Sequence, residues 1–131
     1  MKTSRKKIRM IVEKTPTGFS AFAVEYPVFT TALTITELID NSYEAANLYF
    51  AKSKIWIQPV NLKFEFDLKQ FFKYYRVINA NYLADKIGMN PTLLSQYVQG
   101  HKKPSEAQTK KIFVGINKIG RELSEIKLFV K

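Results

Sequence analysis

The most informative part of this 131-residue chain reads Leu83-Ala84-Asp85-Lys86-Ile87-Gly88-Met89-Asn90-Pro91-Thr92-Leu93-Leu94-Ser95-Gln96-Tyr97-Val98-Gln99-Gly100. Apolar residues recur at helical spacing in its first half, which predicts a short helix over 79–87 that ends at Gly88. Asn90 is a favoured N-cap and Pro91 takes the first helical position, so a second helix is predicted from 91 to about 99. Two short helices joined by such a turn predict a helix-turn-helix.

The second predicted helix has an apolar side and a polar side. The apolar side chains are spaced i, i+3 and i+4 and should pack inward: Leu94, Tyr97 and Val98. The polar side can hydrogen-bond base edges or phosphates through Thr92, Ser95, Gln96 and Gln99. Leu93 is placed to touch a thymine methyl. No carboxylate occurs from Pro91 to Ser105, so nothing there repels phosphate, and Lys102 and Lys103 suit contacts with a DNA backbone.

This segment and the loop after it, His101-Lys102-Lys103-Pro104-Ser105, closely resemble the helix-turn-helix of phage-repressor-like (Xre/Cro) regulators. The matches are Leu-Ala in the first helix, Gly at the turn, Leu-Ser-Gln in the recognition helix, Gly at its end, and a basic loop closing on Pro-Ser. The resemblance implies that Asn79 and Asn81 contact phosphate groups of the DNA backbone. Pro91 departs from it, because relatives often have a polar base reader there. The candidate DNA-binding residues are Asn79, Asn81, Asn90, Thr92, Leu93, Ser95, Gln96, Gln99, Lys102 and Lys103.

Helices are also predicted on both sides of this motif. Apolar spacing over 68–75 predicts a helix capped by Asp67. Ser105 and Gln108 form a capping box that opens a longer helix. The apolar stripe of that helix is a candidate dimer surface, although one domain could equally fill it: Ile112, Phe113, Ile116, Ile119 and Leu123. A short tail follows at 127–131.

The first half of the chain has a different pattern. Ile8, Met10 and Val12 lie on one side of a strand predicted over 8–14, and a turn containing Pro16 and Gly18 leads into a second strand over 19–26. Phe22, Val24 and Tyr26 are predicted to share one side of that second strand. A short strand over 28–31 follows, then a helix over 35–52 opened by a capping box of Thr34 and Glu37, then a strand with alternating Leu62, Phe64 and Phe66. The predicted order is β-β-β-α-β.

This half resembles the HicB antitoxins over roughly residues 8–66. The resemblance is carried by a Gly-Phe hairpin, then Tyr26-Pro27, Phe29-Thr30-Thr31, Thr34, Glu37, Asn41 and Glu44-Ala45. Val28 and Ala32 depart from it, because the family usually has Gly at both places. The resemblance implies a degenerate ribonuclease-H-like fold and a partner, a HicA-type toxin that cleaves mRNA. It also implies autorepression through operator DNA by a homodimer or higher even oligomer.

Charge divides the chain in the same way. The sequence contains 21 Lys+Arg and 11 Asp+Glu, a net charge of +10, which favours a polyanionic partner. Residues 1–67 carry nine Lys/Arg and seven Asp/Glu, a net of +2, whereas residues 68–131 carry twelve and four, a net of +8. We therefore expect an α+β protein with a small sheet domain at 1–67 that binds toxin and an all-α helix-turn-helix domain at 68–131 that binds DNA.

Enzymatic activity is not expected. The chain has no Cys and one His, which excludes thiolate metal sites and leaves little for His-based chemistry, and we expect neither metal nor cofactor. His101 is expected to be a surface or phosphate-contact residue. Glu37, Asp40 and Glu44 lie along one helical face, but a two-metal nuclease needs several carboxylates that converge. Trp56 could be a partner-binding residue or a core anchor.

Two alternative hypotheses for the function remain. One is a stand-alone helix-turn-helix transcriptional regulator whose first domain senses a ligand or only dimerises; the other is a ribonuclease-H-like enzyme. A small basic open reading frame adjacent to this gene would favour the antitoxin.

No segment approaches the roughly 20 apolar residues of a membrane span. Charged residues interrupt the apolar stretch after the basic N-terminal segment, so a cytoplasmic protein is expected. That segment, with Lys2, Arg5, Lys6 and Lys7, is a solubilising tail or a nucleic-acid arm.

Overall fold

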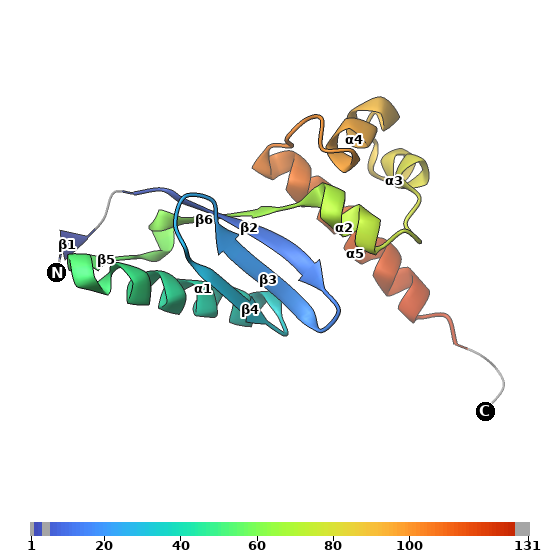
Figure 1. Ribbon diagram of the computed structural model, residues 1–131. Coiled ribbons are helices and arrows are strands. Elements are labelled where there is room, and N and C mark those ends of the chain that lie inside the picture. The colour runs from blue at the N-terminus through green and yellow to red at the C-terminus, as the bar shows by residue number, and fades with distance from the viewer. Residues whose placement is uncertain (1, 4–5, 128–131) are drawn as a thin grey trace. The chain divides into compact units, whose positions relative to one another are not determined.

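The computed structural model describes residues 2–3 and 6–127 (Figure 1). Within that range the protein is α+β, with a four-stranded mixed sheet and five α-helices, which confirms the predicted class. The chain divides into two compact units, Met1–Tyr74 and Tyr75–Lys131. Arg5 of the basic N-terminal segment and residues 128–131 of the predicted tail lie outside the described residues.

The sheet of the first unit has the strand order β4-β3-β2-β6. Antiparallel pairs join β2 (Ile8–Thr15) to β3 (Gly18–Ala23) and β3 to β4 (Phe29–Ala32). Helix α1 (Ile35–Phe50) then leads to β6 (Leu62–Phe66), which lies parallel to β2. This is the predicted β-β-β-α-β order. A further short parallel pair joins β1 (Lys2–Thr3) to β5 (Ile55–Trp56).

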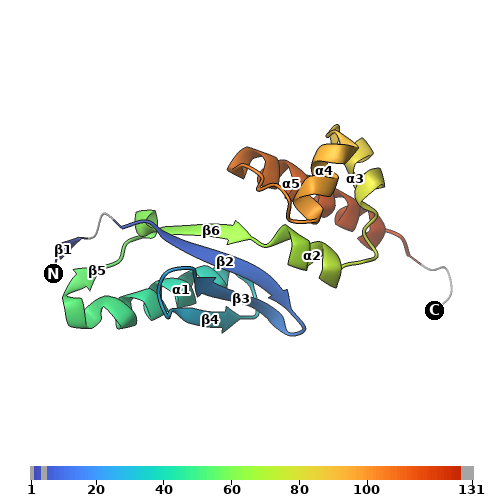
Figure 2. The same ribbon diagram turned by 45° about the horizontal axis from the view of Figure 1, so that its top comes forward.

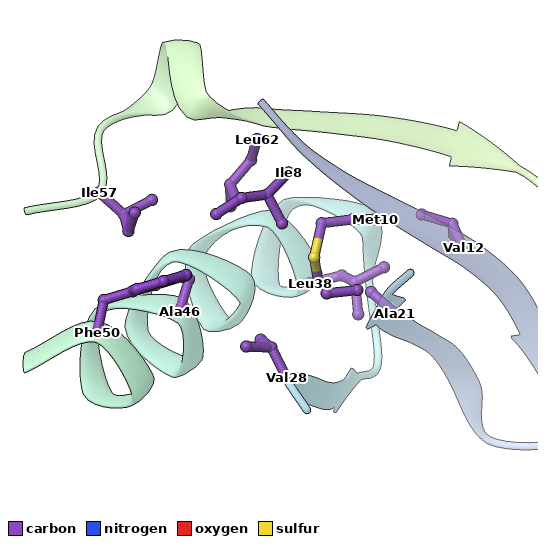
Figure 3. Packing of buried hydrophobic residues seen from close by; sticks show 11 residues of the cluster. Ile8, Met10, Val12, Ala21, Val28, Leu38, Ala46, Phe50, Ile57 and Leu62 are labelled. Carbon is purple, nitrogen blue, oxygen red and sulfur yellow. The ribbon is translucent and has the colours of Figure 1, made fainter. Parts of the chain in front are cut away.

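Helix α1 covers one face of the sheet and forms the core with it (Figure 2). Ile8, Met10 and Val12 are at most 2% exposed, as their alternation in the sequence predicted. In Figure 3, Met10 of β2 meets Leu38 of α1 across this core. Each fully buried Leu, Ile or Met side chain contributes about 1.5–3 kcal/mol through removal of apolar surface from water.

The prediction for the side chains of β3 was wrong. The strand ends at Ala23, and Ala21 and Ala23 are the residues that face the core, since they pair with Val12 and Met10. Phe22 therefore points to the opposite face. The small alanine side chains leave room for Met10 and Leu38, as Figure 3 shows for Ala21. Size complementarity across the sheet decided the orientation here, and the larger apolar residue was not the buried one.

Helix α2 (Leu68–Tyr74) belongs to the first unit, although the predicted boundary at Asp67 assigned it to the second. Asp67 caps it as predicted, with Oδ1 accepting from the Gln70 N–H at 3.0 Å. The Gln70 side chain forms two hydrogen bonds with Lys14 of β2: its Oε1 accepts from the Lys14 N–H at 2.9 Å and its Nε2 donates to the Lys14 carbonyl at 2.7 Å. These bonds tie α2 to the sheet.

The second unit contains three helices, α3 (Ala80–Ile87), α4 (Pro91–Val98) and α5 (Glu106–Ser124). Gly88 ends α3 in the left-handed region at φ 69°, and the Ser105 hydroxyl caps α5 by accepting from the Gln108 N–H at 3.1 Å. The buried residues are Leu83, Ala84, Met89, Leu94, Tyr97 and Ile112. In the predicted stripe of α5, Phe113, Ile116 and Ile119 are half-buried and Leu123 is exposed. No helix in the described part of the chain is long and apolar enough to cross a membrane.

Candidate nucleic-acid interface

Helix α4 begins at a fully formed cap. Asn90 Oδ1 accepts from the backbone N–H of Thr92 at 2.8 Å and of Leu93 at 3.3 Å. Pro91 occupies the first helical position, where its missing N–H costs nothing. The predicted N-cap is confirmed. Because its side-chain oxygen stabilises the helix, Asn90 has a structural task that is independent of any contact with DNA.

The polar side chains of α4 form one row. Thr92 and Gln99 are exposed and Ser95 and Gln96 are half-buried, at the spacing i, i+3, i+4 and i+7. A helix rises 1.5 Å per residue, so the row is about 10 Å long, and a B-DNA major groove admits an α-helix.

The opposite side of α4 packs inward. Leu94 is fully buried and Tyr97 is 7% exposed, and Val98 is half-buried. Leu93 is half-buried beside the polar row, so part of its side chain remains available. The structure therefore keeps the predicted polar residues of α4 together on one side.

Two asparagines lie where α3 begins. Asn79 caps this helix, with Oδ1 accepting from the Tyr82 N–H at 3.0 Å, and Asn81 is exposed in the first turn. A helix N-terminus carries partial positive charge and unpaired N–H groups, which suit a phosphate. Tyr82 was missed by the sequence analysis: it is 59% exposed, and the Lys86 Nζ lies 5.7 Å from its ring centroid. The spacing i, i+4 of Tyr82 and Lys86 in the predicted helix was the sequence signal that could have indicated their contact.

The basic loop after α4 folds back on the end of that helix. The Gln96 carbonyl accepts from the backbone N–H of His101 at 2.9 Å and of Lys102 at 3.2 Å. Gly100 makes this return possible with φ 78°. Lys102 and Lys103 are exposed next to the C-terminal end of α4. The loop is thus held by the same residue, Gln96, whose side chain was predicted to read a base.

The acidic residues of the first unit do not converge. Glu37, Asp40 and Glu44 are exposed along α1. Glu65 pairs with Arg9 instead, through contacts of 3.3 and 3.1 Å, and this carboxylate raises the pKa of the guanidinium by hydrogen bonding and by charge. Among the described residues, no three His, Cys, Asp or Glu side chains are grouped so that they could hold a metal ion.

Trp56 and Ile57 have different environments. Ile57 is 2% exposed and belongs to the core, whereas Trp56 on β5 is 46% exposed. The side chain that anchors this segment is therefore Ile57. Trp56 remains accessible to a partner.

Neither a scan against models of protein families nor a search of curated proteins finds a match to this chain.

Proposed function

We propose that this chain is an antitoxin of the HicB type in a type II toxin-antitoxin system. In this proposal it binds and neutralises a HicA-type toxin that cleaves mRNA, and it represses its own operon by binding operator DNA. The first unit, a degenerate ribonuclease-H-like domain, holds the toxin. The helix-turn-helix of the second unit binds DNA. The chain itself acts without catalysis or cofactor, in the cytoplasm.

The observation that carries DNA binding is the row of Thr92, Ser95, Gln96 and Gln99 on α4, supported by an inward side that is packed. Hydroxyl and amide groups can read base edges, and lysines next to them supply contacts to phosphate. The N-terminus of α3 offers a second phosphate contact near Asn79. No acidic residue lies between Lys86 and Ser105 to oppose the DNA charge.

The support for toxin binding is the order of elements in the first unit. The β-β-β-α-β order is the one that the resemblance to HicB antitoxins implies, and a helix-turn-helix after it agrees with the many members that end in such a domain. The carboxylates of α1 are exposed along the helix and do not converge. A ribonuclease of this fold class would need converging acids instead.

The test is co-expression with the product of the neighbouring gene, followed by purification and footprinting on the DNA upstream of the operon. We expect a stable complex with a small basic protein, relief of its toxicity in cells, and protection of a palindromic site. Half-sites about 34 Å apart would match two recognition helices in a dimer. Protection of DNA without any toxin complex would favour the alternative, a stand-alone transcriptional regulator with a sensing or dimerisation domain. Absence of both would reject the proposal.

A further inference from the structure

The second unit contains a groove that the proposed function does not use. It lies between the last turn of α3 and the outer side of α5, and its volume is about 400 Å³. Four cations surround it: Lys86, Lys110, Lys111 and Lys118. The lining residues include no carboxylate. It opens at the opposite end of α3 from Asn79, the predicted phosphate contact.

The apolar part of the groove's lining, here called its floor, consists of Ile87 of α3 and Ala107, Val114 and Gly115 of α5. A β-carbon at Gly115 would collide with the Ile87 side chain, so the absence of a side chain there allows the helices to come together. Val114 is 55% exposed. A groove with an apolar floor and cationic edges fits an acidic segment that also carries an apolar side chain.

The cations are spread along α5. Lys111 and Lys118 are seven residues apart, which is about 10 Å along a helix. Both are exposed. Charges spaced about 10 Å apart along one helix suit a partner with two or more carboxylates in line.

Helix α1 of the same sequence has the complementary pattern. Glu37 and Glu44 are exposed and are also seven residues apart, with exposed Asp40 between them. Leu48, one turn beyond Glu44, is 74% exposed. This helix therefore presents three carboxylates and one apolar side chain on its solvent side. Its acidic row has the same length as the lysine row of α5.

The register of the two helices follows from these positions. If they run antiparallel, Glu44 meets Lys111 and Glu37 meets Lys118. Leu48 then lies over Ala107, one turn before Lys111 and part of the apolar floor. In the parallel alignment Leu48 would meet Glu122, one turn after Lys118. The antiparallel alignment is the one that matches charge with charge and apolar surface with apolar surface.

We propose that the α3–α5 groove binds the acidic face of α1 from a second copy of this chain. In a two-fold dimer the contact is made twice, once in each direction, which doubles the number of ion pairs. The proposal goes beyond the proposed function, because it would hold without toxin or operator. Exposed ion pairs are individually weak, so the association is salt-sensitive and reaches its full extent only at high protein concentration.

The experiment uses two variants of the full chain, each measured by sedimentation equilibrium in about 0.1 M salt. At that ionic strength the Debye length is about 10 Å, so repulsion between two basic molecules is screened while close pairs survive. Variant one is Lys111→Glu with Lys118→Glu, and variant two is Glu37→Lys with Glu44→Lys. We expect the wild type to dimerise and each variant alone to bind itself about tenfold more weakly or worse.

The decisive measurement is an equal mixture of the two variants. In a mixed dimer, the unchanged Glu37 and Glu44 of variant one face the unchanged lysines in the groove of variant two. The lysines introduced into α1 of variant two face the glutamates introduced into the groove of variant one. Both contacts are attractive, so the dimer should return in the mixture. A matched control is Lys69→Glu with Lys73→Glu, which changes the charge equally at exposed positions of α2 and should dimerise as the wild type does. Thermal melting of every variant checks that it is folded, and Glu37→Gln with Glu44→Gln replaces variant two if that protein fails to fold.

Three results would overturn the proposal: a wild type that stays a single chain at all concentrations, variants that dimerise unchanged, or a mixture of the charge-reversed variants that does not associate. Toxin neutralisation and operator protection are measured separately, so failure of this contact in the charge-reversed variants or in their mixture is distinguishable from failure of the proposed function. A wild type that stays a single chain would also remove the homodimer expected at the palindromic site. Conversely, loss of operator binding would leave this contact intact.

Discussion

Asn90 offers a test that separates a structural task from a contact with DNA. Its side-chain oxygen accepts two hydrogen bonds, at 2.8 and 3.3 Å, from the first turn of α4. Asn90→Ala removes both and should cost about 1 kcal/mol of stability. For a small domain this lowers the melting temperature by about 4–8 °C. Asn90→Asp keeps an oxygen acceptor and places a negative charge at a helix N-terminus, where it is favourable.

The two variants should therefore differ in a defined way. We expect Asn90→Asp to melt at or above the wild-type temperature and yet to bind operator DNA at least about tenfold more weakly, because a carboxylate next to phosphate is repelled. Thr34 is the matched control, since its hydroxyl caps α1 by accepting from the Glu37 N–H at 3.1 Å. Thr34→Asp adds the same charge far from α4 along the chain and should leave DNA affinity within about twofold.

Differential scanning calorimetry and a binding titration at fixed salt give the two readouts. If Asn90→Ala melts like the wild type, the cap does not contribute as its geometry implies. If Asn90→Asp binds the operator as tightly as the wild type, Asn90 does not lie near phosphate and the proposed docking of α4 is wrong.

Other consequences can be tested separately. Gln96→Ala should cost about 1–3 kcal/mol of operator binding and relax specificity at one base position, and unchanged protection in a footprint would show that it reads no base. The double variant Lys102→Ala, Lys103→Ala should reduce the slope of log K against log salt by about 2; an unchanged slope would place both side chains away from the backbone. A fragment of residues 1–74 should bind toxin and not DNA and should melt higher than a fragment of residues 1–67, because only the longer one keeps the Gln70–Lys14 hydrogen bonds; equal melting would show that α2 does not stabilise the sheet.

Local sequence signals predicted the elements well. The predicted caps at Thr34, Asn90 and Ser105 each have an acceptor oxygen at the start of a helix, and each accepts the expected backbone N–H. Such interactions span three residues or fewer, so the sequence contains all the information needed to find them. The same holds for the side of α4 that packs inward, since a helix repeats its faces every turn.

Features that depend on distant partners were missed. Alternation alone could not show that Ala21 and Ala23, and not Phe22, face α1, because that choice depends on the volume of Met10 and Leu38 on neighbouring elements. A large residue is buried only where the opposite side leaves space for it. The groove of α3 and α5 was missed for a related reason. Its lysines come from two helices that are separated in the sequence, and their close approach depends on the absence of a side chain at Gly115.

The extent of the first unit shows most clearly how a polar residue can define a boundary. A charge-based division placed the limit at Asp67, where the half of the sequence with a net charge of only +2 ends. Gln70 lies beyond that point, yet its amide acts as donor and acceptor to the backbone of Lys14, fifty-six positions earlier in the chain. Backbone groups inside a protein need partners, and the end of β2 finds its partner in this glutamine. Helix α2 therefore completes the sheet to which Lys14 belongs, and an experiment that divides the chain before Gln70 removes a structural part of the first unit.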